Sequence, residues 1–292
     1  MLVARDDSLF ALVIPSRQTG SITVMRVGPG EKLMRRSLPF ALSFYLMDVS
    51  AGREGVYAGT AVIKRFTNVP DVLVRIDPET LAVRARASFP GRVAALEHGR
   101  SMWASIGDGR VVRLDPRTLK VEASRRLLAP AAVEMEGLSL SKPAFAFGSL
   151  WVLTGDTRAE KLVRLDPLSL AVRSQTRLPV ALARAVGSRV VGGRGRLALV
   201  GTAIVGVDAA GKLIGRPVAV SGLTAAEMRG SGWVGVTCCG PALVLLNGRG
   251  RIVARTVLRD GGGILALGGE DVWLLGDAGQ GNGIVHLRLA GR

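Results

Sequence analysis

The two cysteines are the residues whose chemistry is easiest to name. Cys238 and Cys239 are immediate neighbours, and the chain has no other cysteine. Neighbouring cysteines can close only a small, strained disulfide ring, which would form a stiff apolar ledge beside a ligand. Two reduced, buried thiols are the alternative, and a reducing compartment favours them. Two adjacent thiols without a further cysteine or a nearby histidine make a poor metal site, so we expect no bound metal.

The two histidines do not point to catalysis. His98 and His286 lie far apart in the chain, in different repeats. The sequence contains no serine, histidine and aspartate in a hydrolase order, no histidine pair at metal-ligand spacing and no glycine-rich phosphate loop with a lysine. We therefore expect no catalytic residue and no cofactor.

The charge of the chain is its most unusual overall property. It has 39 lysines and arginines against 23 acidic residues, a formal net charge of +16. An excess of this size makes an anionic partner plausible. Aromatic residues are only 4% of the chain and most are expected in the core, which argues against stacking on single-stranded nucleic acid. A nucleic acid is therefore a weakly supported partner.

The basic residues fall into two groups. The first alternates with apolar residues along expected outer strands, where charge solvates the rim and discourages edge pairing. Its members are Arg84, Arg86, Arg125, Arg126, Arg173 and Arg177. The second is expected in loops on one face, together with the acidic Asp71, Asp108, Asp156 and Glu160, and comprises Arg17, Lys64, Arg65, Arg92, Arg110, Arg158, Lys161 and Arg184. General solubility and a specific anion-binding face both remain open.

One long connection is a further candidate for binding. Residues 129–142 carry Glu134 and Glu136 toward the same loop-rich face. Long loops on rigid scaffolds are common places for binding, although a simple difference in loop length explains the insertion equally well.

A repeated turn indicates the elements that must hold these residues. The best copies are Arg-Ile-Asp-Pro-Glu-Thr-Leu at 75–81, Arg-Leu-Asp-Pro-Arg-Thr-Leu at 113–119 and Arg-Leu-Asp-Pro-Leu-Ser-Leu at 164–170. Degenerate copies lie at Asp208 and Asn247, with faint ones near Gly28 and Leu289. A period of about 40 to 45 residues built from four strands is typical of a β-propeller blade. Seven copies predict an all-β, seven-bladed β-propeller of four-stranded antiparallel blades that forms one domain over 1–292.

The aspartates of these turns are expected to be structural. An aspartate at the first turn position accepts backbone N–H groups, and the following proline presets φ. Three aspartates in identical turns are therefore not three catalytic acids.

A second mark in each repeat is an aromatic residue within a short apolar strand. Its recurrence at one place predicts that it fills the space between neighbouring blades. The series comprises Phe10, Tyr57, Trp103, Trp151, Trp233 and Trp273, and the fifth repeat has Leu197-Ala198-Leu199 instead. Residues 264–267, 272–275 and 284–289 are the only strands expected in the last repeat, so we expect a three-stranded last blade.

The repeat resembles that of a known group of propellers. Its Gly-x-Leu-Trp-Val strand, its Arg-Leu-Asp-Pro-x-Thr-Leu-x-Val turn and the following Leu-Pro resemble YVTN-type, YncE-like β-propellers and their quinoprotein-like relatives, most clearly over 72–179. The resemblance implies a fold that serves as a binding platform, an assembly factor or an enzyme. By blade number and length the chain also distantly resembles virginiamycin B lyase. The lyase has Trp-Phe-Thr-Glu strands and a loop His and Glu with magnesium, whereas this chain has Trp-Ala-Ser at 103–105 and Trp-Val-Leu at 151–153.

The sequence also carries expectations about compartment and assembly. No apolar run reaches the roughly 18 residues of a membrane helix, and the first residues do not read as a signal peptide. As written, the chain is expected to be cytoplasmic and monomeric. If the true chain begins upstream of Met1, it is instead exported or membrane-anchored.

These observations favour a non-catalytic binding or scaffold module. Its loop-rich, partly basic face would bind a protein or another anionic ligand. The alternative is a lyase-like or quinone-dependent propeller enzyme. A titratable cluster or a metal at the mouth of the central channel would favour the enzyme.

Overall fold

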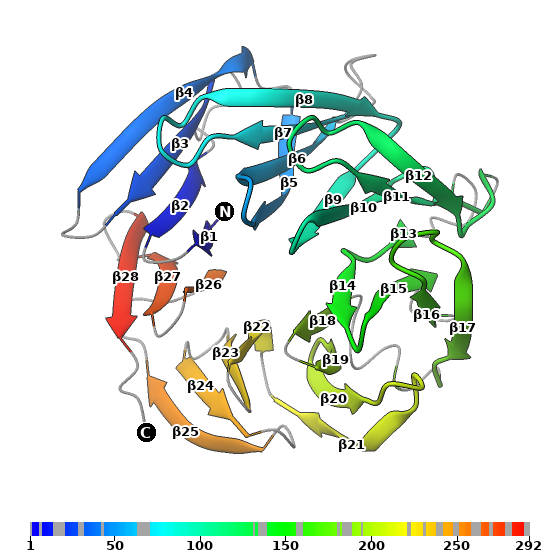
Figure 1. Ribbon diagram of the computed structural model, residues 1–292. Helices are drawn as coiled ribbons and strands as arrows, with labels where there is room; N and C mark the ends of the chain where they lie inside the picture. The colour runs from blue at the N-terminus through cyan, green and yellow to red at the C-terminus, as the bar shows by residue number, and fades with distance from the viewer. Residues whose placement is uncertain are drawn as a thin grey trace. The chain divides into compact units, whose positions relative to one another are not determined.

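The structure is a computed structural model of the chain (Figure 1). It describes residues 2–5, 8–13, 21–28, 32–41, 44–62, 71–130, 132–133, 139–155, 160–179, 182, 189–193, 195–220, 223–229, 232–237, 242–247, 251–257, 264–268, 271–277 and 282–288. In these ranges no helix is long and apolar enough to cross a membrane.

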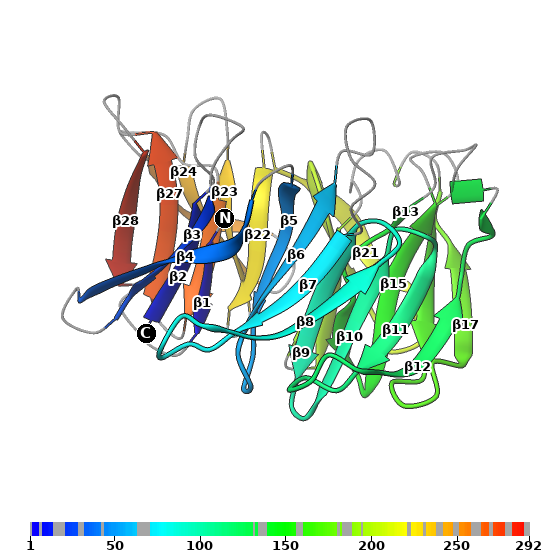
Figure 2. The ribbon, with the colours of Figure 1, turned by 90° about the horizontal axis from the view of Figure 1, so that it is seen from above.

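The protein is an all-β propeller of antiparallel blades, and its chain divides into two compact units. The first comprises 1–143 with 168–170, and the second comprises 144–167 with 171–292. Within a blade, consecutive strands pair in sequence order, as β9 to β12 do in Figure 2. This order follows from the short turns between strands, because tight turns join antiparallel neighbours.

The first unit holds three four-stranded blades and one short strand. The first blade is β1 (Leu2–Arg5), β2 (Ser8–Val13), β3 (Ser21–Val27) and β4 (Leu33–Ala41). The second is β5 (Phe44–Ala51), β6 (Val56–Val62), β7 (Asp71–Ile76) and β8 (Val83–Phe89). The third is β9 (Val93–His98), β10 (Ser101–Ile106), β11 (Arg110–Leu114) and β12 (Val121–Arg126), and β13 (Ser139–Leu140) follows.

The second unit holds three further four-stranded blades. The fourth is β14 (Ala144–Ala146), β15 (Ser149–Gly155), β16 (Lys161–Leu165) and β17 (Val172–Arg177). The fifth is β18 (Arg189–Gly193), β19 (Arg196–Val200), β20 (Ala203–Val207) and β21 (Leu213–Ala219). The sixth is β22 (Leu223–Arg229), β23 (Gly232–Thr237), β24 (Ala242–Leu246) and β25 (Ile252–Val257).

The blade count corrects the sequence-based expectation. The described residues form six four-stranded blades, where seven blades were predicted from the seven turn copies. The remaining sheet of the second unit has three strands, β26 (Ile264–Gly268), β27 (Asp271–Asp277) and β28 (Asn282–Arg288). A turn copy marks the junction of the third and fourth strands, so it does not guarantee a fourth strand.

The repeated Asp-Pro turn folds as its residues predict. The Asp77 carboxylate accepts the backbone N–H groups of Glu79 at 3.0 Å and Thr80 at 2.9 Å. Leu81 closes the turn in the left-handed region, with φ 55°, and is fully buried. This conformation is unfavourable for a leucine, so the burial of its side chain must compensate. Leu119 and Leu170 repeat the feature with φ 60° and 58°.

The aromatic series lies in the core, which confirms its predicted packing role. Phe10, Tyr57, Trp103, Trp151 and Trp233 are buried, each among the apolar residues of its own unit. Trp151, for example, belongs to a cluster that joins the fourth blade to Leu197 and Val205 of the fifth. The side chain of Trp273 lies outside the described part of the chain.

Candidate functional site

The structure describes three of the predicted ligand-binding residues. Arg92 and Lys161 are exposed, whereas Arg110 is half-buried. The other predicted residues, including the cysteines of the possible disulfide, lie outside the described ranges: Arg17, Lys64, Arg65, Glu134, Glu136, Arg158, Arg184, Cys238 and Cys239.

In the first unit, Arg110 is held in an ion-pair cluster. It lies directly opposite Arg126 where β11 begins and β12 ends. Asp108 sits between the two arginines, 2.7 Å from Arg110 Nε and 3.7 Å from Arg126 Nη2. Arg126 also donates to the Asp108 carbonyl oxygen at 2.6 Å. The carboxylate offsets the repulsion of the two like charges, so this pair is already satisfied within the protein.

In the second unit, the equivalent basic pair has no such carboxylate among the residues that the structure describes. Lys161, the first residue of β16, lies directly opposite Arg177, the last residue of β17. Both are exposed, and neither forms an ion pair with a described residue. Arg177 was assigned to the outer rim, but this register places it beside Lys161 at the loop end of the blade. Like charges directly opposite each other destabilise a strand pair, so an anion between them would be stabilising.

The acidic residues expected on the loop side contribute little exposed charge. Asp71 and Glu160 are 4% and 2% exposed, and each interacts within the protein. Asp108 is the half-buried partner of two arginines. Asp156 lies outside the described ranges. The charge that these described positions present to solvent is therefore mainly positive.

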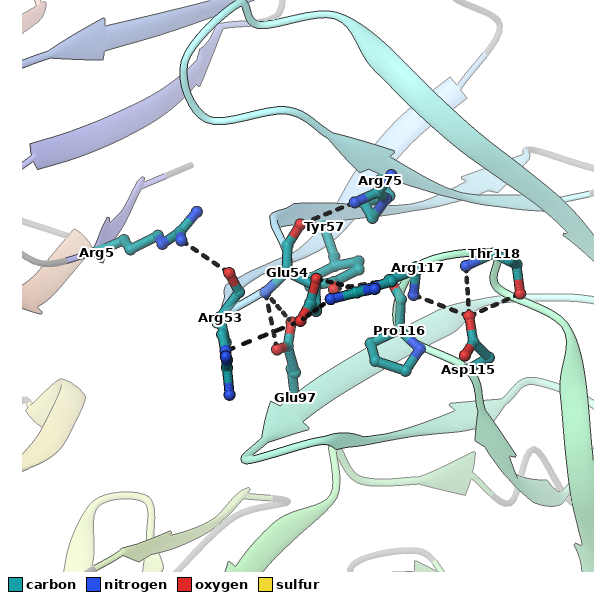
Figure 3. A network of polar contacts seen from close by, with 10 residues as sticks. All are labelled: Arg5, Arg53, Glu54, Tyr57, Arg75, Glu97, Asp115, Pro116, Arg117 and Thr118. Atoms are coloured by element: carbon teal, nitrogen blue, oxygen red, sulfur yellow. Dashed lines mark hydrogen bonds and ion pairs between the residues drawn. The ribbon is translucent and has the colours of Figure 1, made fainter.

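In the first unit, a polar network joins the second and third blades at the ends of the strands where the Asp-Pro turns lie (Figure 3). The Glu54 carboxylate accepts a hydrogen bond from Arg117 Nε at 2.8 Å, and this bond lowers the pKa of Glu54. Arg75 donates to the Glu54 carbonyl at 2.9 Å. Glu97, which is buried, accepts the Glu54 backbone N–H at 3.0 Å.

Tyr57 completes this network as a donor. Its hydroxyl donates to the carbonyl of Pro116 at 3.0 Å. Burial, with a further contribution from Glu97, raises the pKa of Tyr57 far above its ordinary value. Gly52 must be a glycine, because a Cβ there would lie 2.4 Å from Glu97 Cδ. These groups bond to one another across two blades, so we interpret the network as a structural brace.

One more charged pair lies beside the inner strand β5 of the first unit. Asp48 of β5 is 3.0 Å from Lys142 Nζ and accepts the backbone N–H of Ala95 at 2.9 Å. In the part of the chain that the structure describes, no three His, Cys, Asp or Glu residues are grouped to hold a metal ion.

Sequence reasoning missed the role of the arginine that stands two positions before the repeated turn in several blades. This arginine lies directly opposite the aromatic residue of the neighbouring strand, as in the pairs Phe10 with Arg26 and Trp151 with Arg164. The guanidinium carbon lies 6.0 Å from the Phe10 ring centre in the first pair and 5.5 Å from a Trp151 ring centre in the second. The two marks of the repeat are therefore partners across one strand pair.

In the first unit this arginine also reaches the turn of the next blade. Arg26 of the first blade donates to Glu79 Oε2 at 2.8 Å and to the Pro78 carbonyl at 3.3 Å. The arginine thus fastens neighbouring blades together. The fifth blade lacks both partners, because Ala198 lies opposite Gly206 there.

A groove lies at this interruption of the repeat. Its volume is about 450 Å³, and it lies between the fifth and sixth blades of the second unit. The lining residues are Ile204, Val205, Gly206, Ile214, Gly215, Arg216, Pro217, Val218, Trp233 and Arg251. The sequence did show that the fifth repeat lacks the aromatic residue of the other repeats. That difference alone did not predict a groove.

Comparisons with known proteins agree with the fold. The chain matches no family model and no curated protein sequence. It is similar to the solved structure of BamB from Moraxella catarrhalis, with 14% identity and a TM-score of 0.63 over 98% of this chain and 95% of that chain. A chain of the mitotic checkpoint complex has 12% identity and a TM-score of 0.71 over 97% and 87% of the two chains. The computationally designed Ika8 protein has 13% identity and a TM-score of 0.62 over 98% and 82%. At these identities the likeness shows the fold alone, that of a β-propeller.

Proposed function

We propose that the protein is a non-catalytic binding or scaffold module that holds an acidic protein surface at basic residues on its loop side. The observation that carries this proposal is the pair formed by Lys161 and Arg177. These cations lie opposite each other, exposed and without an ion pair to any described residue. We further propose kinship with YncE-like propellers, which rests on the Arg-x-Asp-Pro repeat.

The contrast between two blades supports this reading. At the same place in the third blade, Asp108 lies between Arg110 and Arg126. The fourth blade has the cations without a described carboxylate, so a partner's carboxylate can take that place. Such a bond is charge-assisted and stronger than a neutral hydrogen bond. The mitotic checkpoint complex shows that a propeller chain of similar fold occurs in an assembly.

The test is binding of a polyglutamate peptide, measured by isothermal titration calorimetry at low salt. The variant Lys161→Ala/Arg177→Ala removes the unpaired cations and should weaken binding about tenfold, because two charge-assisted contacts are lost.

The control variant Arg84→Ala/Arg173→Ala removes the same charge from outer strands. Arg84 is 3.1 Å from Asp77, and Arg173 forms an ion pair with Asp166, so both are already bonded within the protein. We expect this variant to bind within about twofold of wild type, since it keeps the proposed contacts. Equal losses in the two variants would contradict the proposal, because they would show that only total charge matters.

A further inference from the structure

The fifth blade departs from the repeat at two adjacent places in the second unit. The first is Gly206 of β20, which stands where the third strands of other blades carry Arg75, Arg113 or Arg164. No large side chain therefore projects from this position of β20.

The second departure is a bulge in the outer strand β21. Ile204 pairs with Val218 and Gly206 pairs with Ile214, so three residues of β21 stand opposite Val205 alone. These residues are 215–217, and Gly215 has φ +74°. Bulges of this kind redirect side chains and often lie beside binding sites. Here the bulge carries Arg216, which is exposed and lines the groove.

The sixth blade supplies the other wall. Trp233 lies opposite Leu246, the last residue of β24. In the fourth blade, Leu150 holds the corresponding position opposite Leu165, and Trp151 lies one residue further along its strand, opposite Arg164. A shift by one residue turns a side chain to the other face of its sheet. Trp233 accordingly packs with Ala198 and Ile204 of the fifth blade.

Arg251 completes the groove from the turn that precedes β25. In the first unit the corresponding space is crossed by Arg26, which bonds to the turn of the next blade. In the fifth blade Gly206 cannot make that crossing, so the groove occupies the place of a missing inter-blade contact.

The surface around the groove is apolar and basic. Ile214 is 59% exposed at its edge, and Ile252, Val253 and Val257 of the neighbouring strand β25 are 47%, 62% and 70% exposed. Exposed aliphatic side chains next to a groove can contribute to an interaction surface.

The charge of the groove has one sign. Arg216 and Arg251 line it, and none of the lining residues that the structure describes is acidic. Neither arginine forms an ion pair with a residue of the described ranges. The groove therefore offers two guanidinium groups without an ion-pair partner among the described residues, next to aliphatic side chains and the largely buried Trp233.

We propose that this groove binds an extended, acidic segment of a partner protein. An apolar side chain of the segment would lie against Ile214, and neighbouring carboxylates would bond to Arg216 and Arg251. Guanidinium groups suit this task because they bind carboxylates with two parallel hydrogen bonds. An extended segment fits better than a small molecule, since the groove is lined by two arginines from different blades and exposed aliphatic side chains follow Arg251 in β25. This site is separate from the basic pair of the proposed function.

The first experiment is a selection of short displayed peptides on the immobilised protein. Peptides that bind the immobilisation support alone are removed. The surviving peptides should place Asp or Glu next to Leu, Ile, Phe or Trp. Survivors without acidic residues, or no survivors at all, would overturn the proposal.

The Gly206→Arg variant restores the residue of the repeat and fills the groove. It should fold, because a Cβ at Gly206 meets Ile214 Cβ at 3.5 Å, an ordinary contact, and no positive φ is required there. The best peptide, measured by fluorescence anisotropy, should bind this variant at least about tenfold more weakly than wild type. Equal affinity for wild type and Gly206→Arg would contradict the proposal.

A second variant keeps the test decisive if Gly206→Arg unfolds, which circular dichroism melting would reveal. Arg216→Ala/Arg251→Ala should lose about tenfold in peptide affinity, because both charge-assisted contacts are removed. The matched control Arg86→Ala/Arg125→Ala removes two exposed outer-strand arginines of the first unit and should bind within about twofold of wild type. Equal loss in the control would overturn the proposal. Lys161→Ala/Arg177→Ala should leave peptide affinity unchanged, so the two proposals can fail independently.

Discussion

At the scale of single residues, Asp77 shows how the turn carboxylates serve the fold. Its oxygens accept the N–H groups of Glu79 and Thr80 and the Nε–H of Arg84. These donors, with the Thr80 N–H first among them, lower the pKa of Asp77 from its ordinary value of 3.8 to about 2. Asp115 is held in the same way, and its pKa is lowered chiefly by the hydroxyl of Thr118. These carboxylates stay ionised at neutral pH and are poor general acids.

The lowered pKa predicts an acid sensitivity of folding. The folded state binds the Asp77 proton more weakly than the unfolded state, so the stabilisation is complete above about pH 4 and is lost as the pH falls toward 2. It amounts to at most about 2 kcal/mol, and less after solvent screening. Asp77→Asn keeps an acceptor oxygen but cannot ionise. In urea unfolding, the variant should lose less stability than wild type between pH 4 and pH 2. Parallel pH profiles for the two proteins would show that the turn does not have this role.

At the scale of elements, the strands and turns were accessible from the sequence because their signals are local. Alternating apolar residues and the Asp-Pro turn predicted each blade around 75–81, 113–119 and 164–170, and burial of Trp103 and Trp151 confirms their predicted core role. The pairing of Trp151 with Arg164 was missed because it depends on register between strands. The bulge at 215–217 was missed for the same reason.

The candidate site was less predictable than the fold. Lys161 was selected as a loop-side cation, and its side chain is exposed. Arg177 was assigned to the outer rim, because its alternation with apolar residues could not reveal that it faces Lys161. Arg216 and Arg251 were not selected at all, since the groove that they line requires a bulge, a missing side chain and a neighbouring blade together.

The packing of Trp151 within its blade leads to a prediction about stability. It is 1% exposed, donates to the Ala146 carbonyl at 3.1 Å, and stacks near Arg164. Trp151→Ala should therefore lower the free energy of unfolding by about 3 to 5 kcal/mol, because it leaves a cavity and an unpaired carbonyl. Leu168→Ala, at a side chain that is 64% exposed, should change it by less than about 0.5 kcal/mol. Urea unfolding gives both values.

The same variant distinguishes a packing role of Trp151 from a role in ligand binding. Below its unfolding temperature, Trp151→Ala should still bind the polyglutamate peptide, since the side chain does not face the ligand. A variant of wild-type stability that no longer binds would reassign this aromatic series from packing to recognition.

At the scale of the whole molecule, the net charge of +16 does not mean that every cation is available to a partner. Some of the described cations form ion pairs within the protein, and others form none with a described residue. Arg26, Arg113 and Arg117 form ion pairs with Glu79, Glu122 and Glu54. Such exposed pairs add little stability, but they reduce the number of cations available to a partner. The cations at Lys161, Arg177, Arg216 and Arg251 have no such described partner, so they carry the binding proposals.

The measurement that tests the central claim most directly is the salt dependence of polyglutamate binding. Each cation that contacts the polyanion releases a counterion, so the logarithm of the association constant falls with the logarithm of salt concentration. Lys161→Ala/Arg177→Ala should make this slope shallower by about one to two, as expected for two lost contacts, while Arg84→Ala/Arg173→Ala should leave it unchanged. An unchanged slope in the first variant, or an equal change in both, would contradict a binding module that uses this basic pair.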